Sequence, residues 1–270
     1  MTVSRYSPDL DLARTLADAA DGITTARFRA LDLTVDSKPD RTPVTDADTA
    51  VEDAVRTLLT RHRPDDAVAG EERGGSATGP GRVWVIDPID GTKNFLRGLP
   101  VWATLIALVE DGTPVVGMIS APLLGRRWWA GADAGAWVAD GSGVRGIGVS
   151  RVSDPADATV STTDLGSWVE HHRRESYLRL VDATWESRAF GDFWHHCLVA
   201  EGALDIAVEP IVNTWDVAPV RVLVEQAGGR FTDLAGAPRI DGGSALSTNG
   251  LLHDTALALL SAPDTAPGTH

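Results

Sequence analysis

The sequence predicts an α/β protein, with an α+β arrangement in its first half, and three observations support this class. The chain has 270 residues, of which 43% are hydrophobic and 23% are charged, values typical of a folded protein with a substantial core. Before residue 150, two helical patterns precede a series of apolar strands. After residue 150, short apolar runs alternate with helical patterns, which predicts helices layered on a sheet.

The first half begins with two expected helices. Residues 9–31 carry apolar side chains at roughly helical spacing, although Gly22 weakens the pattern. A second helix is expected to begin near Thr45, because Thr45 followed by Asp48 is a plausible N-cap pair and an apolar face follows it. The segment Ser37–Pro43 between them contains three charged residues and two prolines, so we expect a loop.

Strands dominate the remainder of the first half. Asp111-Gly112 is a strong turn signal between two long apolar runs and predicts a hairpin. Residues 73–81 are rich in Gly, Ser, Thr and Pro and are expected to be mobile, while Gly141–Gly148 is expected to be a turn-rich connection. The expected strands are Ala67–Ala69, Val83–Ile86, 102–110, 114–121, Arg127–Ala130 and Ala136–Ala139.

The second half alternates between strands and helices. The expected strands are Ala158–Ser161, Glu186–Phe190, Leu204–Val208, Gly229–Thr232 and Ala245–Thr248. The expected helices are His171–Ala183, Asp192–Gly202, Trp215–Ala227 and Leu251–Ser261. We therefore divide the chain into an N-terminal half at 1–150, a C-terminal half at 151–262 and a flexible tail at 263–270.

The charge balance excludes some classes of function. The chain has 24 basic and 38 acidic residues, a formal charge of −14, so it lacks the basic footprint of a nucleic-acid binder. An anionic substrate would then need a locally positive site, which a metal ion can supply. A single cysteine, Cys197, excludes an internal disulfide. The sequence has no run of 18 apolar residues, the length that would predict a membrane span. Without a secretory signal pattern either, we expect a cytoplasmic protein that binds no membrane.

The segment from Trp84 to Phe95 carries the strongest chemical signal. A buried strand delivers Asp87, Pro88 is expected to stop regular structure, and Asp90 precedes a Gly-Thr pair that can open a helix. Carboxylates are hard oxygen ligands suited to Mg²⁺. Free N–H groups at the start of a helix are suited to phosphate. One short segment thus offers both halves of a metal–phosphate site.

The alternative is that Asp87 and Asp90 merely cap a turn and a helix. Other acidic residues stand at similar places along the chain, where a strand ends or a helix begins. These clusters are Thr45-Asp46-Ala47-Asp48, Gly70-Glu71-Glu72 and Trp215-Asp216. Capping alone does not explain four such clusters, so we favour a shared site.

These motifs resemble those of the inositol monophosphatase superfamily of metal-dependent phosphatases. The resemblance rests on Gly70-Glu71-Glu72, Asp87-Pro-Ile-Asp-Gly-Thr92, Trp215-Asp216-Val-Ala218 and Glu225-x-Ala-Gly-Gly229, and it spans roughly residues 10–260. It implies a layered αβαβα sandwich, a small phosphate ester as substrate, and two or three Mg²⁺ ions per site, with Mn²⁺ as a possible substitute. It also implies a homodimer, for which the sequence itself provides no independent sign.

The resemblance further implies roles for individual residues. Glu71, Asp87 and the carbonyl of Ile89 would hold a first Mg²⁺, and Glu71 is also a catalytic candidate. Asp87, Asp90 and Asp216 would hold a second ion. Asp48 and Thr92 would orient the attacking water, and the N–H groups of Gly91 and Thr92 would bind phosphate oxygens. We expect in-line attack by water, without a phospho-enzyme intermediate.

The flanking segments bear on the phosphate ester itself. Arg188–Gly202 and Leu204–Pro210 are similar to the histidinol-phosphatase branch of the superfamily. The ammonium and imidazole of histidinol phosphate call for carboxylates, and Asp192 and Glu209 are the candidates, with Asp216 nearby. Arg188 is a candidate contact to substrate or phosphate. The alternatives are a broad-specificity inositol-1-phosphate phosphatase and, more remotely, a regulator that keeps the fold without catalysis.

Several conspicuous side chains favour plainer interpretations. Adjacent histidines such as His195-His196 point apart on a helix and are poor chelators, although either could contact substrate. Trp128 and Trp129 point to opposite faces if they lie in a strand, so at most one can line a site. Cys197 lies between apolar residues and is expected to be buried and inert. Lys93 could neutralise phosphate or simply be solvated.

Overall fold

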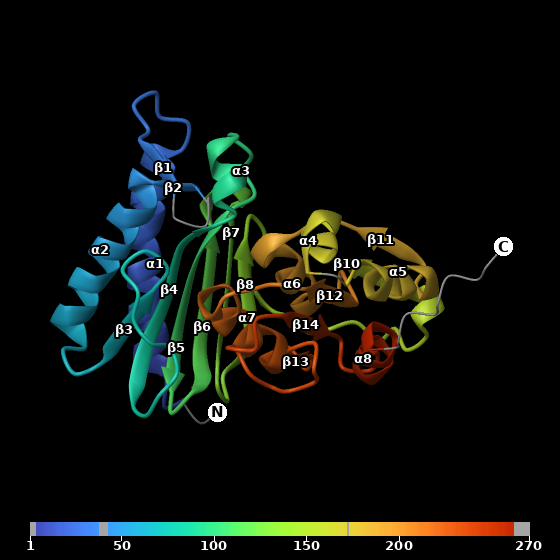
Figure 1. The fold of residues 1–270 in the computed structure, drawn as a ribbon. Helices are drawn as coiled ribbons and strands as arrows, with labels where there is room; N and C mark the ends of the chain where they lie inside the picture. The colour runs from blue at the N-terminus through green and yellow to red at the C-terminus, as the bar shows by residue number, and fades with distance from the viewer. Residues whose placement is uncertain (1–3, 38–42, 172, 262–270) are drawn as a thin grey trace.

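The computed structural model describes residues 4–37, 43–171 and 173–261, and it has five layers in the order αβαβα (Figure 1). The first layer holds α1 (Ser7–Arg27) and α2 (Asp46–His62). The central layer holds α6 (Asp192–Ala200) and α7 (Thr214–Gln226), between the two sheets. The last layer holds α4 (Leu165–Glu170), α5 (Arg174–Ala183) and α8 (His253–Ser261). The predicted layered class is therefore confirmed.

The larger sheet has seven strands in chain order, and only its first pair, β3 with β4, is parallel. Its central strands are apolar on both faces because helices cover both sides. On β4, Trp84 and Ile86 pack against α1 and α2, while Val83 and Val85 face the central layer. The strands are β3 (Ala67–Gly70), β4 (Arg82–Asp90), β5 (Ala103–Glu110), β6 (Thr113–Ala121), β7 (Arg126–Gly131), β8 (Gly135–Asp140) and β9 (Gly143–Gly146).

The smaller sheet has the strand order β11-β10-β12-β14-β13, and its first three strands are parallel. The strands are β10 (Thr159–Ser161), β11 (Glu186–Arg188), β12 (Ile206–Glu209), β13 (Arg230–Thr232) and β14 (Ala245–Thr248). The parallel strands end beside the N-terminus of α6, so the residues that follow β10 and β12 can meet those that begin α6.

Helix α7 joins the two sheets. Gly117 on β6 allows its close approach, because a Cβ there would lie 2.5 Å from the carbonyl oxygen of Pro219 on α7. One hydrophobic cluster consequently runs from β4 and β5 through α6 and α7 to β12 and β14. The N-terminus of α7, which carries Asp216, is thereby held against the end of β4.

The structure corrects the expected end of β4. The strand continues through Pro88 to Asp90, whereas we expected regular structure to stop at Pro88. The ladder with β5 is nevertheless interrupted there, because its register shifts between Asp87 and Asp90 and Pro88 has no N–H to donate. The carbonyl of Pro88 accepts a hydrogen bond from Thr104 Oγ1 instead, at 2.8 Å.

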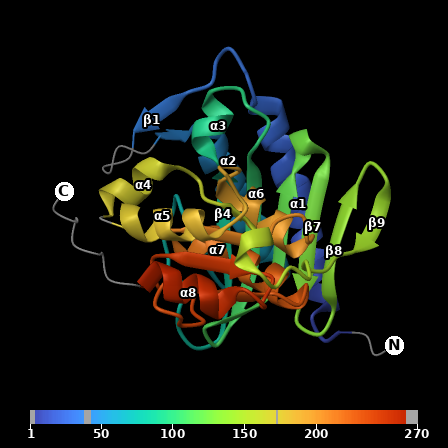
Figure 2. The same ribbon diagram turned by 90° about the vertical axis from the view of Figure 1, so that its right-hand side faces the viewer.

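Other boundaries also differ from expectation. The first helix ends at Arg27 rather than at residue 31, and Arg29 adopts a left-handed conformation with φ 59°. The segment Gly141–Gly148 contains β9, an exposed edge strand that projects with β8 from the body (Figure 2). Its four residues are exposed, so no apolar pattern marked it.

Short elements account for the remaining differences. Helix α4 was not anticipated, and the helix expected at His171 begins at Arg174. The end residues of the expected loop, Ser37 and Pro43, belong to the paired strands β1 (Val35–Ser37) and β2 (Pro43–Thr45). Residues 38–42 and the tail predicted at 263–270 lie outside the described part. Within the described residues, no helix combines the length and apolar character needed to cross a membrane.

Candidate active site

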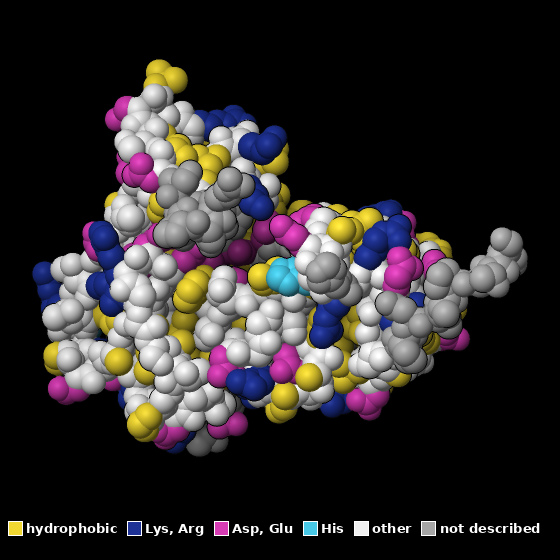
Figure 3. Space-filling model, viewed as in Figure 1, with side chains coloured by type: hydrophobic (Ala, Val, Ile, Leu, Met, Phe, Trp, Pro, Cys, Tyr) yellow, Lys and Arg dark blue, Asp and Glu magenta, His cyan; other side chains and the backbone are white. Residues whose placement is uncertain are grey.

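Acidic side chains gather in a hollow where the first sheet, the central layer and the second sheet meet (Figure 3). We call this hollow the acidic recess. It collects the ends of β3 and β4, the start of α3 (Thr92–Leu96) and the N-termini of α6 and α7. Its lining residues are Pro43, Glu71, Asp87, Ile89, Asp90, Gly91, Thr92, Lys93, Asn94, Thr163, Asp164, Asp192, Asn213 and Asp216.

Three predicted ligands converge in the recess. Asp87, Asp90 and Asp216 each offer a carboxylate oxygen, and these atoms lie within 4.8 Å of one another. Backbone N–H groups hold all three: that of Ile89 donates to Asp87 Oδ1 at 3.0 Å, and that of Phe193 donates to Asp90 Oδ2 at 2.5 Å. Asp216 is the N3 residue of α7, and its Oδ2 accepts from the N–H of Asn213 at 2.7 Å.

The electrostatics of these carboxyl groups indicate what would fit between them. Burial, and then the charges of Glu71, Asp90 and Asp216, hold the pKa of Asp87 well above its usual range. Burial, with the charges of Asp192 and Asp216, does the same for the pKa of Asp90. Burial is also the main cause that raises the pKa of Asp216 to about 8. A cation would relieve this repulsion, and an oxygen-only donor set suits a hard divalent ion.

Gly91 begins α3 in the left-handed region, with φ 84°, which favours glycine. A Cβ at this position would lie 3.0 Å from the carbonyl oxygen of Val101 and 3.5 Å from Asp192 Oδ2. The hydroxyl of Thr92 donates to the carbonyl of Ile89 at 2.9 Å. Gly91 and Thr92 thus line the recess beside the carboxylate group, with Lys93 next to them.

Asp48 is not among the lining residues of the recess. It is buried near the start of α2, where its Oδ2 accepts from the backbone N–H of Thr45 at 2.8 Å and from the Thr45 hydroxyl at 2.6 Å. Burial raises its pKa to about 6, and the nearby charge of Glu71 adds to that rise. The expected N-cap pair is therefore present, and its carboxyl group lies within electrostatic reach of the recess.

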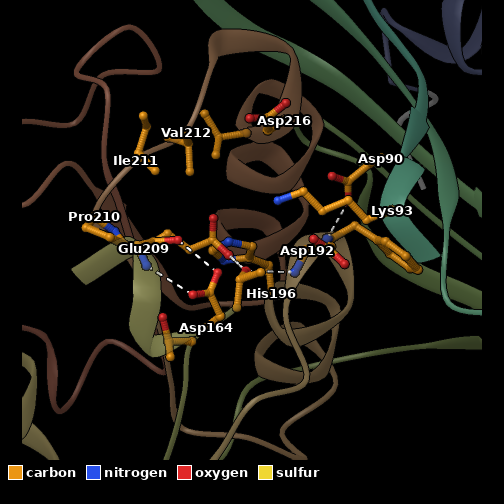
Figure 4. A pocket seen from close by; sticks show the side chains of 15 residues that line it. Asp90, Lys93, Asp164, Asp192, His196, Glu209, Pro210, Ile211, Val212 and Asp216 are labelled. Carbon is orange, nitrogen blue, oxygen red and sulfur yellow. Dashed lines mark hydrogen bonds between the residues drawn. The ribbon is translucent and has the colours of Figure 1, made fainter. Parts of the chain in front are cut away.

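A second cavity, which we call the side pocket, opens beside the recess (Figure 4). It has a volume of about 190 Å³, enough for several waters or a small organic group, since a water occupies about 30 Å³. Lys93 extends into it from α3. Its lining residues are Asp90, Lys93, Thr162, Thr163, Asp164, Ser167, Asp192, Phe193, His196, Glu209, Pro210, Ile211, Val212, Asp216 and Val217.

Two predicted substrate contacts, Asp192 and Glu209, face this pocket. Glu209 accepts a hydrogen bond from the Thr163 hydroxyl, and its Oε1 lies 3.2 Å from His195 Nε2. Burial raises the pKa of Glu209 to about 8. Burial and the charge of Glu209 raise the pKa of Asp192 to about 7. Asn94 Nδ2 donates to Asp192 Oδ2 at 3.0 Å and so connects α3 to the start of α6.

Arg188 lies elsewhere. Its guanidinium donates to Glu186 on the same edge strand, and its side chain lines a separate cavity with Tyr177 and Leu178. Among the described lining residues of the recess and the side pocket, neither Trp128 nor Trp129 occurs. These two tryptophans do point to opposite faces of β7, and Cys197 is buried as expected.

His195 and His196 are both buried, and His196 reaches the side pocket. Burial lowers the pKa of His195 to about 3 and that of His196 well below its usual range, so both imidazoles are neutral. One nitrogen from each, together with a Glu209 oxygen, falls within 4.8 Å. His196 Nδ1 and Ser247 Oγ are 2.8 Å apart, a polar contact that needs no metal to explain it.

Sequence reasoning missed several residues of the site. Thr163 and Asp164 line both cavities, directly after β10. The signal was available, because polar residues at the carboxyl ends of parallel strands tend to face a shared crevice. Glu52 contacts the loop that carries Glu71, and it lies on the same helical face as Asp48, four residues later.

With this fold and these acids in place, comparison with known proteins defines the class. The model of the inositol monophosphatase family matches residues 6–262, and the chain belongs to that family. A solved inositol monophosphatase from Zymomonas mobilis shares the fold with a TM-score of 0.84 and 32% identity, over 96% of this chain and all of that one.

Two relatives are closer in sequence. The chain is 55% identical to a histidinol-phosphatase of Mycobacterium tuberculosis, over 94% of this chain and 98% of that protein. It is 51% identical to a histidinol-phosphatase of Streptomyces coelicolor, over 94% of this chain and 97% of that protein.

Proposed function

We propose that this protein is a phosphoric monoester hydrolase that converts L-histidinol phosphate to L-histidinol and phosphate, a step of histidine biosynthesis. The observation that carries the proposal is the side pocket, where the carboxyl groups of Asp192 and Glu209 face the same cavity as Asp90 and Asp216. A leaving group with an ammonium and an imidazole has matching partners there. The identity to two histidinol-phosphatases over nearly the whole chain supports the same substrate.

The cofactor that we propose is Mg²⁺, at two or three ions per site, with Mn²⁺ as a substitute. Glu71, Asp87 and the Ile89 carbonyl would hold one ion, and Asp87, Asp90 and Asp216 would hold another. When bound, the ions supply positive charge at the phosphate and lower the pKa of water. The fit rests on the oxygen-only donor set and on the raised pKa of the buried carboxyl groups, which indicates that the site favours a compensating cation.

The chain's own groups would then perform distinct tasks. The N–H groups of Gly91 and Thr92 would bind phosphate oxygens, and Asp48 and the Thr92 hydroxyl would orient the attacking water. Asp192 and Glu209 would bind the leaving group in the side pocket, which aligns the ester for in-line attack. Arg188 is held by Glu186 on an edge strand, so a role in substrate binding requires its side chain to reorient.

The test compares two substrates under identical conditions with Mg²⁺ in excess. We expect kcat/KM for L-histidinol phosphate to exceed that for inositol 1-phosphate by at least about 100-fold, which corresponds to about 2.7 kcal/mol. Comparable values would instead favour the second candidate, a generalist phosphatase. The similarity of the fold to that of the Zymomonas mobilis inositol monophosphatase is the observation that supports this candidate. Release of phosphate in EDTA at an undiminished rate would contradict the metal assignment.

Three further expectations complete the proposal. We propose that residues 1–150 carry most of the metal ligands, and that residues 151–262 carry Asp216 and the leaving-group contacts.

We propose a homodimer, which light scattering on the purified chain would detect as twice the 28.6 kDa mass. We also propose a cytoplasmic location, in keeping with a substrate that is a small biosynthetic intermediate.

A further inference from the structure

One face of α2 lies against the loop that carries Glu71. Asp48, Glu52 and Arg56 occur at intervals of four residues and therefore share that face. Asp48 is a candidate catalytic residue, whereas Glu52 has no place in the proposed reaction. Its carboxylate is nevertheless fully buried, with a side-chain exposure of 0%. A buried carboxylate is costly unless hydrogen bonds compensate it, so its partners indicate why it is there.

The partners of Glu52 are the residues that directly follow Glu71. Its Oε2 accepts from the backbone N–H of Glu72 at 2.8 Å, and its Oε1 accepts from the backbone N–H of Arg73 at 3.1 Å. Arg56 Nε donates to the same Oε1 at 2.8 Å. Charged acceptors form stronger hydrogen bonds than neutral ones, particularly in a buried setting. Glu52 thus fixes the backbone immediately after the candidate ligand.

Arg56, the ion-pair partner of Glu52, binds backbone carbonyls on both sides of the loop. Its guanidinium donates to the carbonyl of Val68 on β3 at 3.3 Å and to the carbonyl of Gly74 at 2.8 Å. The Glu52–Arg56 pair therefore holds the end of β3 and the far end of the 70–74 turn together.

The residue before Glu71 is adapted to this arrangement. Gly70 lies directly against the Glu52 carboxylate, and a Cβ at Gly70 would be 2.6 Å from Oε2 and closer still to Oε1. Real Cβ atoms do not approach other atoms so closely, and Gly70 does not adopt a positive φ that would itself require glycine. The glycine at this position is therefore explained by the space that Glu52 occupies.

From these contacts we infer that Glu52 is a positioning residue for the metal ligand Glu71, which it orients through the backbone N–H groups of Glu72 and Arg73. The inference rests on the proposed metal site. It requires a carboxylate specifically, because Arg56 Nε–H and the backbone N–H groups of Glu72 and Arg73 all donate to Glu52. An amide would have to turn its NH₂ group toward Glu72 N–H, or toward Arg73 N–H and Arg56 Nε–H, and one set of hydrogen bonds would be lost.

The test measures metal binding directly, without substrate. Free Mn²⁺ is titrated into the full-length, metal-free protein and followed by its EPR signal. We expect Glu52→Gln to weaken one class of Mn²⁺ sites by about 10- to 100-fold, the usual effect of removing a group that orients a metal ligand. Sites that depend on Asp90 and Asp216 should change much less, since their supporting N–H groups come from Phe193 and Asn213.

A matched control lies on the same helix. Asp53 neighbours Glu52 and pairs with the same loop residue, Arg73, at 2.8 Å, but through an exposed side-chain contact. Asp53→Asn removes that ion pair and should leave Mn²⁺ binding within about twofold of wild type, because exposed pairs contribute little.

A second variant keeps the test valid if Glu52→Gln folds poorly. Gly70→Ala should displace the Glu52 carboxylate and weaken the same class of Mn²⁺ sites, and the melting temperature in EDTA monitors folding. Variants that melt earlier in EDTA but bind Mn²⁺ like wild type would show a purely structural role and overturn the inference. A wild-type protein that binds no Mn²⁺ would overturn the metal site itself, together with the role of Glu52.

Discussion

We predict that the Asp216 carboxylate destabilises the fold when metal is absent, so that Asp216→Asn stabilises the metal-free protein. Burial, followed by the charges of Glu71, Glu209 and Asp192, raises its pKa from 3.8 to about 8. Because the pKa in the folded state lies above that of the unfolded chain, the folded state binds the additional proton. Without metal, the contribution of Asp216 to the free energy of unfolding is then most favourable below about pH 4 and declines as the pH rises toward 8. Asp216→Asn removes the ionisable group and with it this decline.

The size of the effect follows from the shift. Each unit of pKa shift corresponds to about 1.4 kcal/mol of stability. At pH 7 the pH lies about three units above the unfolded-state pKa of Asp216, so the upper bound is on the order of 4 kcal/mol. The observed gain should be smaller, about 1 to 3 kcal/mol, because the group borders the recess and neighbouring acids can take up protons instead. The asparagine amide oxygen can still accept from the Asn213 N–H, so the cap of α7 is kept.

The assay is thermal melting in EDTA and in excess Mg²⁺, at pH 4.5 and pH 7.5. We expect the Asp216→Asn protein to melt about 2 to 5 °C above wild type in EDTA at pH 7.5, with a much smaller difference at pH 4.5. With Mg²⁺ the order should reverse, because only the wild type gains the full stabilisation of bound metal. Asp254→Asn is the control, since Asp254 occupies the first turn of α8 but is exposed. A variant that melts below wild type in EDTA at pH 7.5 would refute this account of the recess.

The remaining predictions concern activity. Asp90→Asn should lower kcat by several orders of magnitude at saturating Mg²⁺, because it removes a ligand that faces both cavities; near-normal turnover that still requires metal would contradict its role. Glu209→Gln should raise KM for histidinol phosphate by about 10-fold or more, because an amide cannot ionise to pair with the ammonium of the leaving group, and an unchanged KM would exclude that contact. Asn94→Ala should raise the same KM by a smaller factor, since it frees the Asp192 carboxyl group, and a change confined to kcat would argue against that mechanism.

Much of the fold was predictable from local pattern. The runs Val83–Ile86, 102–110 and 114–121 are mainly apolar on both faces because helices cover both sides of the sheet, and such runs are visible in any single sequence. The cap formed by Thr45 and Asp48 depends on residues three positions apart and was equally visible. The edge strand at Gly143–Gly146 left no such pattern, since all its side chains are exposed.

Some acidic residues of the recess could likewise be predicted from one local segment, whereas the contacts of others could not. Asp87 and Asp90 belong to one short segment, and the sequence alone indicated that they act together. The contacts of Glu52 with the loop after Glu71, and the entry of Thr163 and Asp164 beside Glu209, involve residues far apart along the chain. The placement of Arg188 on an edge strand, paired with Glu186, also depends on how β11 joins the second sheet.

The sequence by itself determined the kinds of element, the layered class and the presence of a carboxylate-rich site, because each depends on spacing within one segment or on a motif. Only the tertiary structure decided which carboxyl groups share a cavity and how far each pKa is raised. The physical reason is that burial and charge–charge repulsion depend on distances across the interface between the two sheets. Those distances are determined by the packing of α6 and α7 between the sheets, which no single segment encodes.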